Sequence, residues 1–103
     1  MIDVSIYTGE DGRKRKFILD GHADYGEKGK DIVCASVSSL AIATVNALSA
    51  SKIINLQTGD GFIYCEVMNP SRLSDAFIEV LKVGIEGIET EYSEYVKLHL
   101  LNE

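Results

Sequence analysis

The stretch DIVCASVSSLAIATVNALSA, residues 31–50, decides the fold. Its apolar residues recur three and four positions apart, the spacing of a helix with one buried side. Asp31 stands directly before the first of them and is typical of a residue that caps a helix. We therefore predict a helix from Ile32 to about Ala50. Small or polar side chains line its opposite side, where another element or a second subunit can approach closely: Ser36, Ser39, Ala43 and Asn46.

A β-hairpin is predicted before this helix. Residues 1–8 alternate apolar and polar side chains, and the Gly-Glu-Asp-Gly sequence of residues 9–12 is typical of a turn. A second strand is expected from residue 13 to about residue 20, with Gly21-His22 at its end. The polar residues 23–30 contain two glycines and no apolar period, which predicts a flexible loop leading into the helix.

A second hairpin and a second helix are predicted after the first helix. Strands at 52–58 and 62–68 flank the turn Gly59-Asp60-Gly61. Asn69 is expected to cap the second helix, with Pro70 at its first position. The buried stripe of this helix is predicted to consist of Leu73, Phe77, Val80, Leu81, Gly84 and Ile88.

The last predicted element is a strand over residues 94–101, with Val96, Leu98 and Leu100 directed inward. The order is then strand, strand, helix, strand, strand, helix, strand. Two hairpins favour antiparallel pairing, and helices cover the apolar face of such a sheet. We predict an α+β fold, a two-layer sandwich of a largely antiparallel sheet and two helices, with residues 1–103 forming a single domain.

Composition narrows the class of protein. The chain is 46% apolar and 25% charged, and no apolar run approaches the roughly 18 residues of a membrane span, so we expect a cytoplasmic protein without membrane contact. Sixteen acidic against ten basic residues give a charge of −6, which disfavours direct nucleic-acid binding. Two cysteines are too few for a disulfide framework or a structural zinc site, and we expect no metal and no cofactor.

Cys34 is the first candidate for chemistry. It follows Asp31 by three positions, in the first turn of the predicted helix, where unpaired backbone N–H groups and the helix dipole stabilise a thiolate. The same N–H groups can receive an oxyanion. His22, at the far end of the same loop, is placed to take up the thiol proton. The alternative is that Cys34 is only a small buried residue and His22 an ordinary surface histidine.

The second cysteine and the second histidine have simpler interpretations. Cys65 alternates with polar and aromatic neighbours and shares a strand face with Ile63 and Val67, which predicts a core position. His99 shares its strand face with Tyr95 and Lys97, which predicts a solvated surface. Cys34 and His22 are therefore the better pair.

At Gly21-His22-Ala23, the glycine-bearing loop that follows, and Asp31-Ile32-Val33-Cys34-Ala35-Ser36-Val37-Ser38, the chain resembles the ribosomal-processing cysteine proteases called Prp. The resemblance spans the chain in length and element order, and its specific part runs from residue 21 to about residue 48. It implies an endopeptidase that removes a short N-terminal extension from bacterial large-subunit ribosomal protein L-twenty-seven. It also implies a homodimer, and a mobile loop that closes over the peptide.

The same resemblance carries over roles for individual residues. Cys34 is the expected nucleophile and His22 the expected general base. Asp31 is expected to set the geometry of the loop and helix, with Ser38 one turn beyond Cys34 and Gly21 beside the base as supporting residues. The sequence names no third catalytic residue. The negative charge of the chain suits a basic ribosomal protein as substrate.

Two other functions remain open at this point. The chain is also interpretable as a non-catalytic acidic ribosome-assembly module that binds a basic ribosomal protein tail, with Cys34 serving only in packing. A redox thiol switch at Cys34 is the third hypothesis, and it lacks a resolving partner if Cys65 lies in the core.

Overall fold

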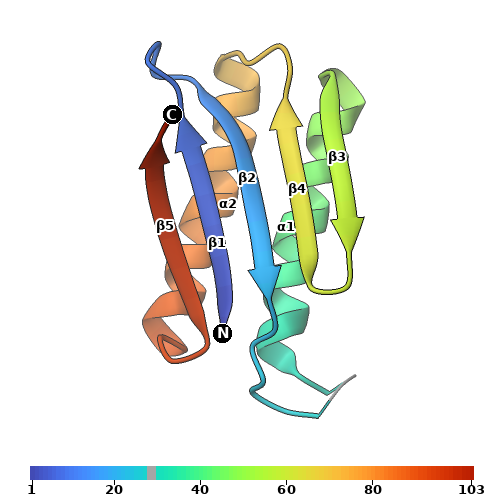
Figure 1. Ribbon diagram of the computed structural model, residues 1–103, viewed down its shortest axis with the longest axis vertical. Coiled ribbons are helices and arrows are strands. Elements are labelled where there is room, and N and C mark those ends of the chain that lie inside the picture. The colour runs from blue at the N-terminus through green and yellow to red at the C-terminus, as the bar shows by residue number, and fades with distance from the viewer. Residues whose placement is uncertain (28–29) are drawn as a thin grey trace.

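The computed structural model describes residues 1–27 and 30–103. The described elements form one five-stranded sheet with both helices on the same face (Figure 1). In chain order they are β1 (Ile2–Thr8), β2 (Lys14–Gly21), α1 (Ile32–Ser51), β3 (Ile54–Gly59), β4 (Phe62–Val67), α2 (Arg72–Glu91) and β5 (Val96–Asn102). The predicted α+β class, the element order and the two hairpins are confirmed.

The strand order is β3-β4-β2-β1-β5, and the sheet is mixed. Among the described strands, three neighbouring pairs are antiparallel, and only β1 and β5 run parallel. The parallel pair arises because α2 carries the chain back along the sheet, so that β5 starts at the same end as β4. Hairpin signals describe only strands joined by short turns, and the position of β5 was therefore not predictable from them.

The core lies between the sheet and the helices. Phe17, Ile78 and Ile85 are among its fully buried side chains. Cys65 belongs to the same core, as predicted, with no exposed surface. A protein of this size depends on one continuous core of this kind, because it buries only about two-thirds of the surface that its unfolded chain exposes.

Three predictions about α2 and β5 were wrong in detail. Ser71 caps α2 through a reciprocal pair of hydrogen bonds with Ser74, whereas Asn69 accepts the Ile53 N–H at 2.9 Å. Leu73 and Val80 are exposed, although both had been assigned to the buried stripe. The helix carries two sets of apolar residues at helical spacing, and the set that packs contains Ile78, Leu81 and Ile85. On the edge strand β5, Val96 is buried but Leu100 is exposed.

No uninterrupted apolar run in the sequence approaches the length of a membrane span, but the average hydropathy of one helix is that of such a span. Helix α1 contains no charged residue, and by length and composition alone it is apolar enough to cross a membrane. Core helices of soluble proteins pass the same test, and one side of α1 packs in the core through Val33, Val37 and Leu48. The average hydropathy of α1 is high because the Ser, Thr and Asn residues that interrupt its apolar residues add no charge.

Candidate active site

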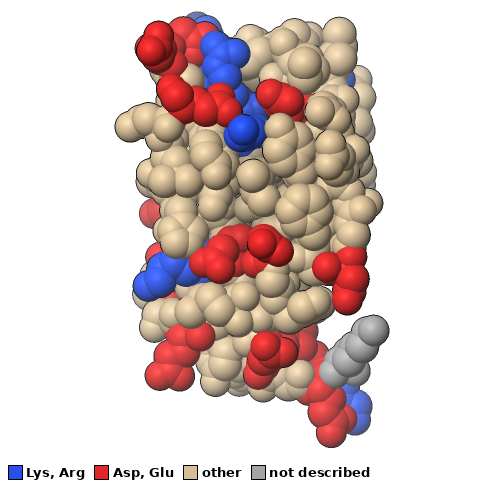
Figure 2. Space-filling model, viewed as in Figure 1, with Lys and Arg blue, Asp and Glu red and all other residues tan. Residues whose placement is uncertain are grey.

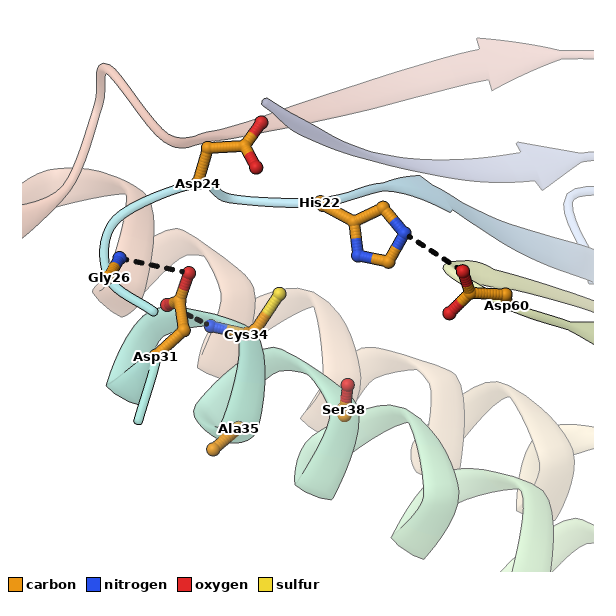
Figure 3. A pocket seen from close by; sticks show the side chains of 8 residues that line it. All are labelled: His22, Asp24, Gly26, Asp31, Cys34, Ala35, Ser38 and Asp60. Carbon is orange, nitrogen blue, oxygen red and sulfur yellow. Dashed lines mark hydrogen bonds and ion pairs between the residues drawn. The ribbon is translucent and has the colours of Figure 1, made fainter. Parts of the chain in front are cut away.

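A cavity of about 510 Å³ opens at one end of the sheet, where three segments meet. The end of β2 and its loop form one wall, the first turns of α1 form the floor, and the turn between β3 and β4 closes the side (Figure 3). The lining residues are His22, Asp24, Gly26, Asp31, Cys34, Ala35, Ser38 and Asp60. Four of the five predicted site residues therefore line one cavity, and Gly21, the fifth, directly precedes His22.

Asp31 organises the start of α1. One carboxylate oxygen accepts the backbone N–H groups of Val33 and Cys34, each at 3.0 Å. The other accepts those of Tyr25 at 2.9 Å and Gly26 at 3.3 Å. These bonds, the one from Cys34 foremost, hold the pKa of the Asp31 carboxyl below its ordinary value, because they stabilise the charged form. The predicted helix cap is confirmed, and the same side chain also ties the loop to the helix.

This arrangement corrects one expectation about the helix start. Backbone N–H groups at the helix start were expected to receive an oxyanion, and two of them, those of Val33 and Cys34, instead donate to Asp31. A capping carboxylate satisfies the donors that an uncapped helix leaves open. The backbone donor that contacts the sulfur comes from the loop, since the Ala23 N–H lies 3.5 Å from Cys34 Sγ. Ala23 is buried, and its packing fixes this donor in place.

Cys34 and His22 face the same space from different elements. Cys34 is half-buried in the first turn of α1, and its sulfur points into the cavity (Figure 3). His22 follows β2, and about half of its side chain is exposed. Its Nε2 is directed at Asp60, and the ring nitrogen on the Cys34 side in Figure 3 is Nδ1. The structure thus brings together the two residues that the sequence paired.

Gly21 and the N-terminus fix the position of His22. Gly21 has φ +107°, and a Cβ there would collide with the carbonyl oxygen of Met1. The Met1 ammonium group donates to the His22 carbonyl oxygen, which ties the start of β1 to the end of β2. A side chain at residue 21 is therefore excluded by both backbone conformation and space.

Ser38 lies one turn beyond Cys34, half-buried at the cavity wall. Asp24 and Asp60 also line the cavity, and the sequence singled out neither of them. Asp24 has φ +57°, an uncommon conformation for a residue other than glycine. Asp60 stood in a Gly-Asp-Gly turn that indicated only a hairpin, and no local pattern connects it to His22, 38 positions earlier.

The loop between His22 and the helix is anchored by aromatic packing. The Tyr25 ring packs edge-on against Tyr92 at 5.4 Å and Tyr95 at 5.0 Å between ring centroids. Residues 28–29 of the predicted mobile loop lie outside the described residues. Within the described ranges, no group of three or more His, Cys, Asp or Glu side chains is arranged to hold a metal ion.

The family model described as cysteine protease Prp matches residues 1–97, which include every residue of the cavity. The chain belongs to the Prp family of cysteine proteases. The ribosomal processing cysteine protease Prp of Staphylococcus aureus strain Mu50 is 33% identical over 104 residues, covering 96% of this chain and 98% of that protein. The family membership predicted from the sequence is thus confirmed, and with it the assignment of the chain as a cysteine protease.

Solved Prp structures agree with this assignment. The crystal structure of S. aureus Prp with a covalently linked product peptide superposes with a TM-score of 0.91 at 31% identity, covering 97% of this chain and 99% of that one. The same enzyme in complex with a substrate peptide gives a TM-score of 0.80 at 30% identity, with the same coverage. The non-catalytic alternative is therefore set aside for this member of the Prp family.

Proposed function

We propose that this protease removes the N-terminal extension of large-subunit ribosomal protein L-twenty-seven, with Cys34 as nucleophile and His22 as general base. The observation that carries the proposal is the shared cavity, into which the sulfur of Cys34 and the imidazole of His22 both face. Support for the substrate comes from the S. aureus relative, which is named a ribosomal processing protease.

The reaction follows thiol chemistry. His22 takes the proton of Cys34, and the sulfur attacks the scissile carbonyl carbon, giving a tetrahedral oxyanion. As this intermediate collapses, the C–N bond breaks, the imidazolium donates its proton to the leaving amine, and a thioester remains on Cys34. A water molecule, deprotonated by His22, then attacks the thioester, releasing the carboxylic acid and restoring the thiol.

The oxyanion needs a donor close to the sulfur, and the Ala23 N–H is the one that the geometry offers. It donates to Cys34 Sγ at 3.5 Å and so lies beside the atom to which the substrate carbonyl carbon becomes bonded. Asp31 supports this arrangement by holding both the loop and the first turn of α1. Ser38 and Gly21 support it at the wall of the cavity and behind the base, respectively.

Charge favours a basic substrate. The end of β2, the start of α1 and the turn between β3 and β4, which line the cavity, lie at the lower end of the molecule in Figure 1. Acidic side chains predominate at that end in the space-filling view (Figure 2). A basic polypeptide is drawn to such a surface, and the attraction weakens with added salt. The N-terminal region of a ribosomal protein fits this requirement.

The test is cleavage of a synthetic N-terminal peptide of the extended ribosomal protein, with product masses read by mass spectrometry. We expect one cut that releases the extension, and no product with Cys34→Ala or Cys34→Ser. Cys65→Ala is the matched control, because that thiol is buried away from the cavity, and it should cleave at the same position. Stoichiometric binding of the peptide without a product, or undiminished cleavage by both Cys34 variants, would contradict the proposal.

We further propose that the protein is a cytoplasmic homodimer that associates through its helical layer. Ser36, Ser39, Ala43 and Asn46 on α1 are all exposed, as the sequence predicted. Apolar side chains are exposed on both helices, among them Ile42 at 52%, Val80 at 65% and Val83 at 59%. Burial of such side chains between two copies removes apolar surface from water.

The oligomeric state is tested by light scattering after size exclusion. The wild type should be a dimer, and Val80→Glu should dissociate it. A monomeric wild type would contradict this proposal.

A further inference from the structure

The turn between β3 and β4 packs against the imidazole of His22. The carbonyl oxygen of Gly61 accepts the Gly21 N–H at 2.8 Å, which joins the turn to the end of β2. Gly61 has φ +63°, and a Cβ placed on it would lie 2.6 Å from His22 Nε2 and 3.1 Å from the carbonyl oxygen of Gly21. Glycine at this position therefore lets the turn lie against the ring edge.

Asp60 is placed on the same side of the ring. Its Oδ2 lies 3.7 Å from His22 Nε2, within ion-pair distance (Figure 3). Among the described residues this is the only ion pair that either side chain makes. The turn is otherwise far from His22 in sequence, and it meets the ring only because β4 pairs with β2.

We propose that Asp60 and Gly61 position the general base: Gly61 lets the turn pack against the ring edge, and Asp60 holds Nε2, which leaves Nδ1 to exchange the proton with Cys34. The inference rests on the proposed role of His22. Asp60 acts through His22 and touches no reacting atom, so it is a positioning residue. It completes an arrangement of nucleophile, base and orienting carboxylate on three separate segments.

The chemical advantage appears when the imidazole is protonated. The Asp60 carboxylate then faces a positive charge, which favours the thiolate–imidazolium pair over the neutral pair. Other charged groups near His22 are the Met1 ammonium group, bonded to its carbonyl oxygen, and the Asp24 carboxylate at the cavity wall. Asp60 is 87% exposed, so water and salt screen its interaction and the effect is modest, about two- to fivefold in rate.

The first test compares Asp60→Asn with Asp24→Asn in the full-length protein. Asn keeps the shape and the turn preference of Asp at residue 60, and it tolerates the left-handed conformation at residue 24. We measure kcat and KM for the peptide separately. In Asp60→Asn kcat should fall about two- to fivefold with KM within about twofold, because the ring loses the carboxylate beside Nε2 and the imidazolium loses its counter-charge. In Asp24→Asn kcat should change less than in Asp60→Asn, because no ion pair joins Asp24 to His22 among the described residues.

The second test uses two glycines of the same turn. Gly61→Ala introduces a methyl group against the ring and should lower kcat about tenfold with KM within about twofold, because the base is displaced. Gly59→Ala is the matched control, since a Cβ there meets nothing within 4 Å, and it should cleave as the wild type does. Equal kcat values for the two variants would overturn the role of Gly61.

Failure of this inference differs from failure of the proposed function. If the wild type cleaves and Asp60→Asn has the same kcat, or if Asp24→Asn lowers kcat equally, Asp60 does not position the base. If the wild type does not cleave the peptide, the proposed substrate is wrong. The rate of Cys34 alkylation by iodoacetamide at pH 7 then decides the inference: Asp60→Asn should slow it about two- to fivefold, and an unchanged rate overturns it.

Discussion

The two cysteines place the same functional group in opposite environments. Cys65 lies in the middle of β4, paired with Phe17 on β2, and burial raises the pKa of its thiol from 9.0 to about 11. Cys34 lies in the first turn of α1, half-buried, with an N–H group donating to its sulfur and a histidine lining the same cavity. We therefore expect the thiol in the core of the sheet to be inert and the thiol among the ends of the elements to be the reactive one.

The difference lies in what surrounds each sulfur. Cys65 belongs to the buried apolar cluster that the strands form with the two helices, which surrounds the sulfur with apolar contacts. The surroundings of Cys34 come from a strand end, a loop, a helix start and a hairpin turn, which supply backbone N–H groups and charged side chains. The regular elements serve to hold these ends at fixed positions.

Outside Cys34 itself, the largest expected effect comes from removing His22, the proposed base. His22→Ala should lower kcat/KM for the peptide by about 10²- to 10⁴-fold, the range that general acid–base catalysis contributes. The matched control is His99→Ala, since His99 pairs with Asp3 at 2.8 Å on the open face of the sheet, outside the cavity. Equal activities of the two variants, measured by product mass, would place the proton transfer elsewhere.

A smaller effect is expected from loosening the helix start. Asp31→Ala removes the acceptor of four backbone N–H groups, so the loop and the first turn of α1 lose their common anchor. We expect a loss of about ten- to a hundredfold in kcat/KM from misplacement of Cys34. A wild-type rate would show that the cap is structural only.

Asp31 also predicts a pH dependence of folding. Its folded pKa lies below the ordinary value of 3.8, so its contribution to the free energy of unfolding is full above that pH. The contribution is lost as the pH falls through the lowered folded value, because protonation removes the charge that accepts the hydrogen bonds. In Asp31→Asn the melting temperature should therefore depend less steeply on pH below about 4 than in the wild type. An identical acid slope in both proteins would contradict this.

Cys65 should act at the opposite end of the pH scale. Because its pKa is raised, the thiol makes its whole contribution to the free energy of unfolding below pH 9. This contribution is lost as the pH rises toward about 11, because the thiol ionises first in the unfolded chain. The loss is of order 2 kcal/mol. Cys65→Ala should remove this alkaline slope, at a cost of about 1–2 kcal/mol in packing at neutral pH. Chemical denaturation of both proteins from pH 8 to 11 measures it.

Local sequence patterns predicted the surroundings of Cys65 and part of the surroundings of Cys34. Strand alternation was sufficient to place Cys65 in the core, and the spacing from Asp31 to Cys34 was sufficient to predict the capped helix start. The donor from Ala23 and the approach of Asp60 to His22 depend on how strands pair across the sheet, which no local pattern encodes. The prediction of the buried stripe on α2 was wrong because two sets of apolar residues on this helix have helical spacing, and only the packing of the helix decides which set is buried.

The most direct test of the central claim is a comparison of the two thiols in one sample. The folded protein is treated with iodoacetamide at pH 7, and each cysteine peptide is followed by mass spectrometry. Cys34 should be modified at least about a hundredfold faster than Cys65, because one sulfur is half-exposed beside donors and the other is buried with its pKa near 11. Comparable rates at the two positions, or a Cys34 that resists modification in the native protein, would contradict the account.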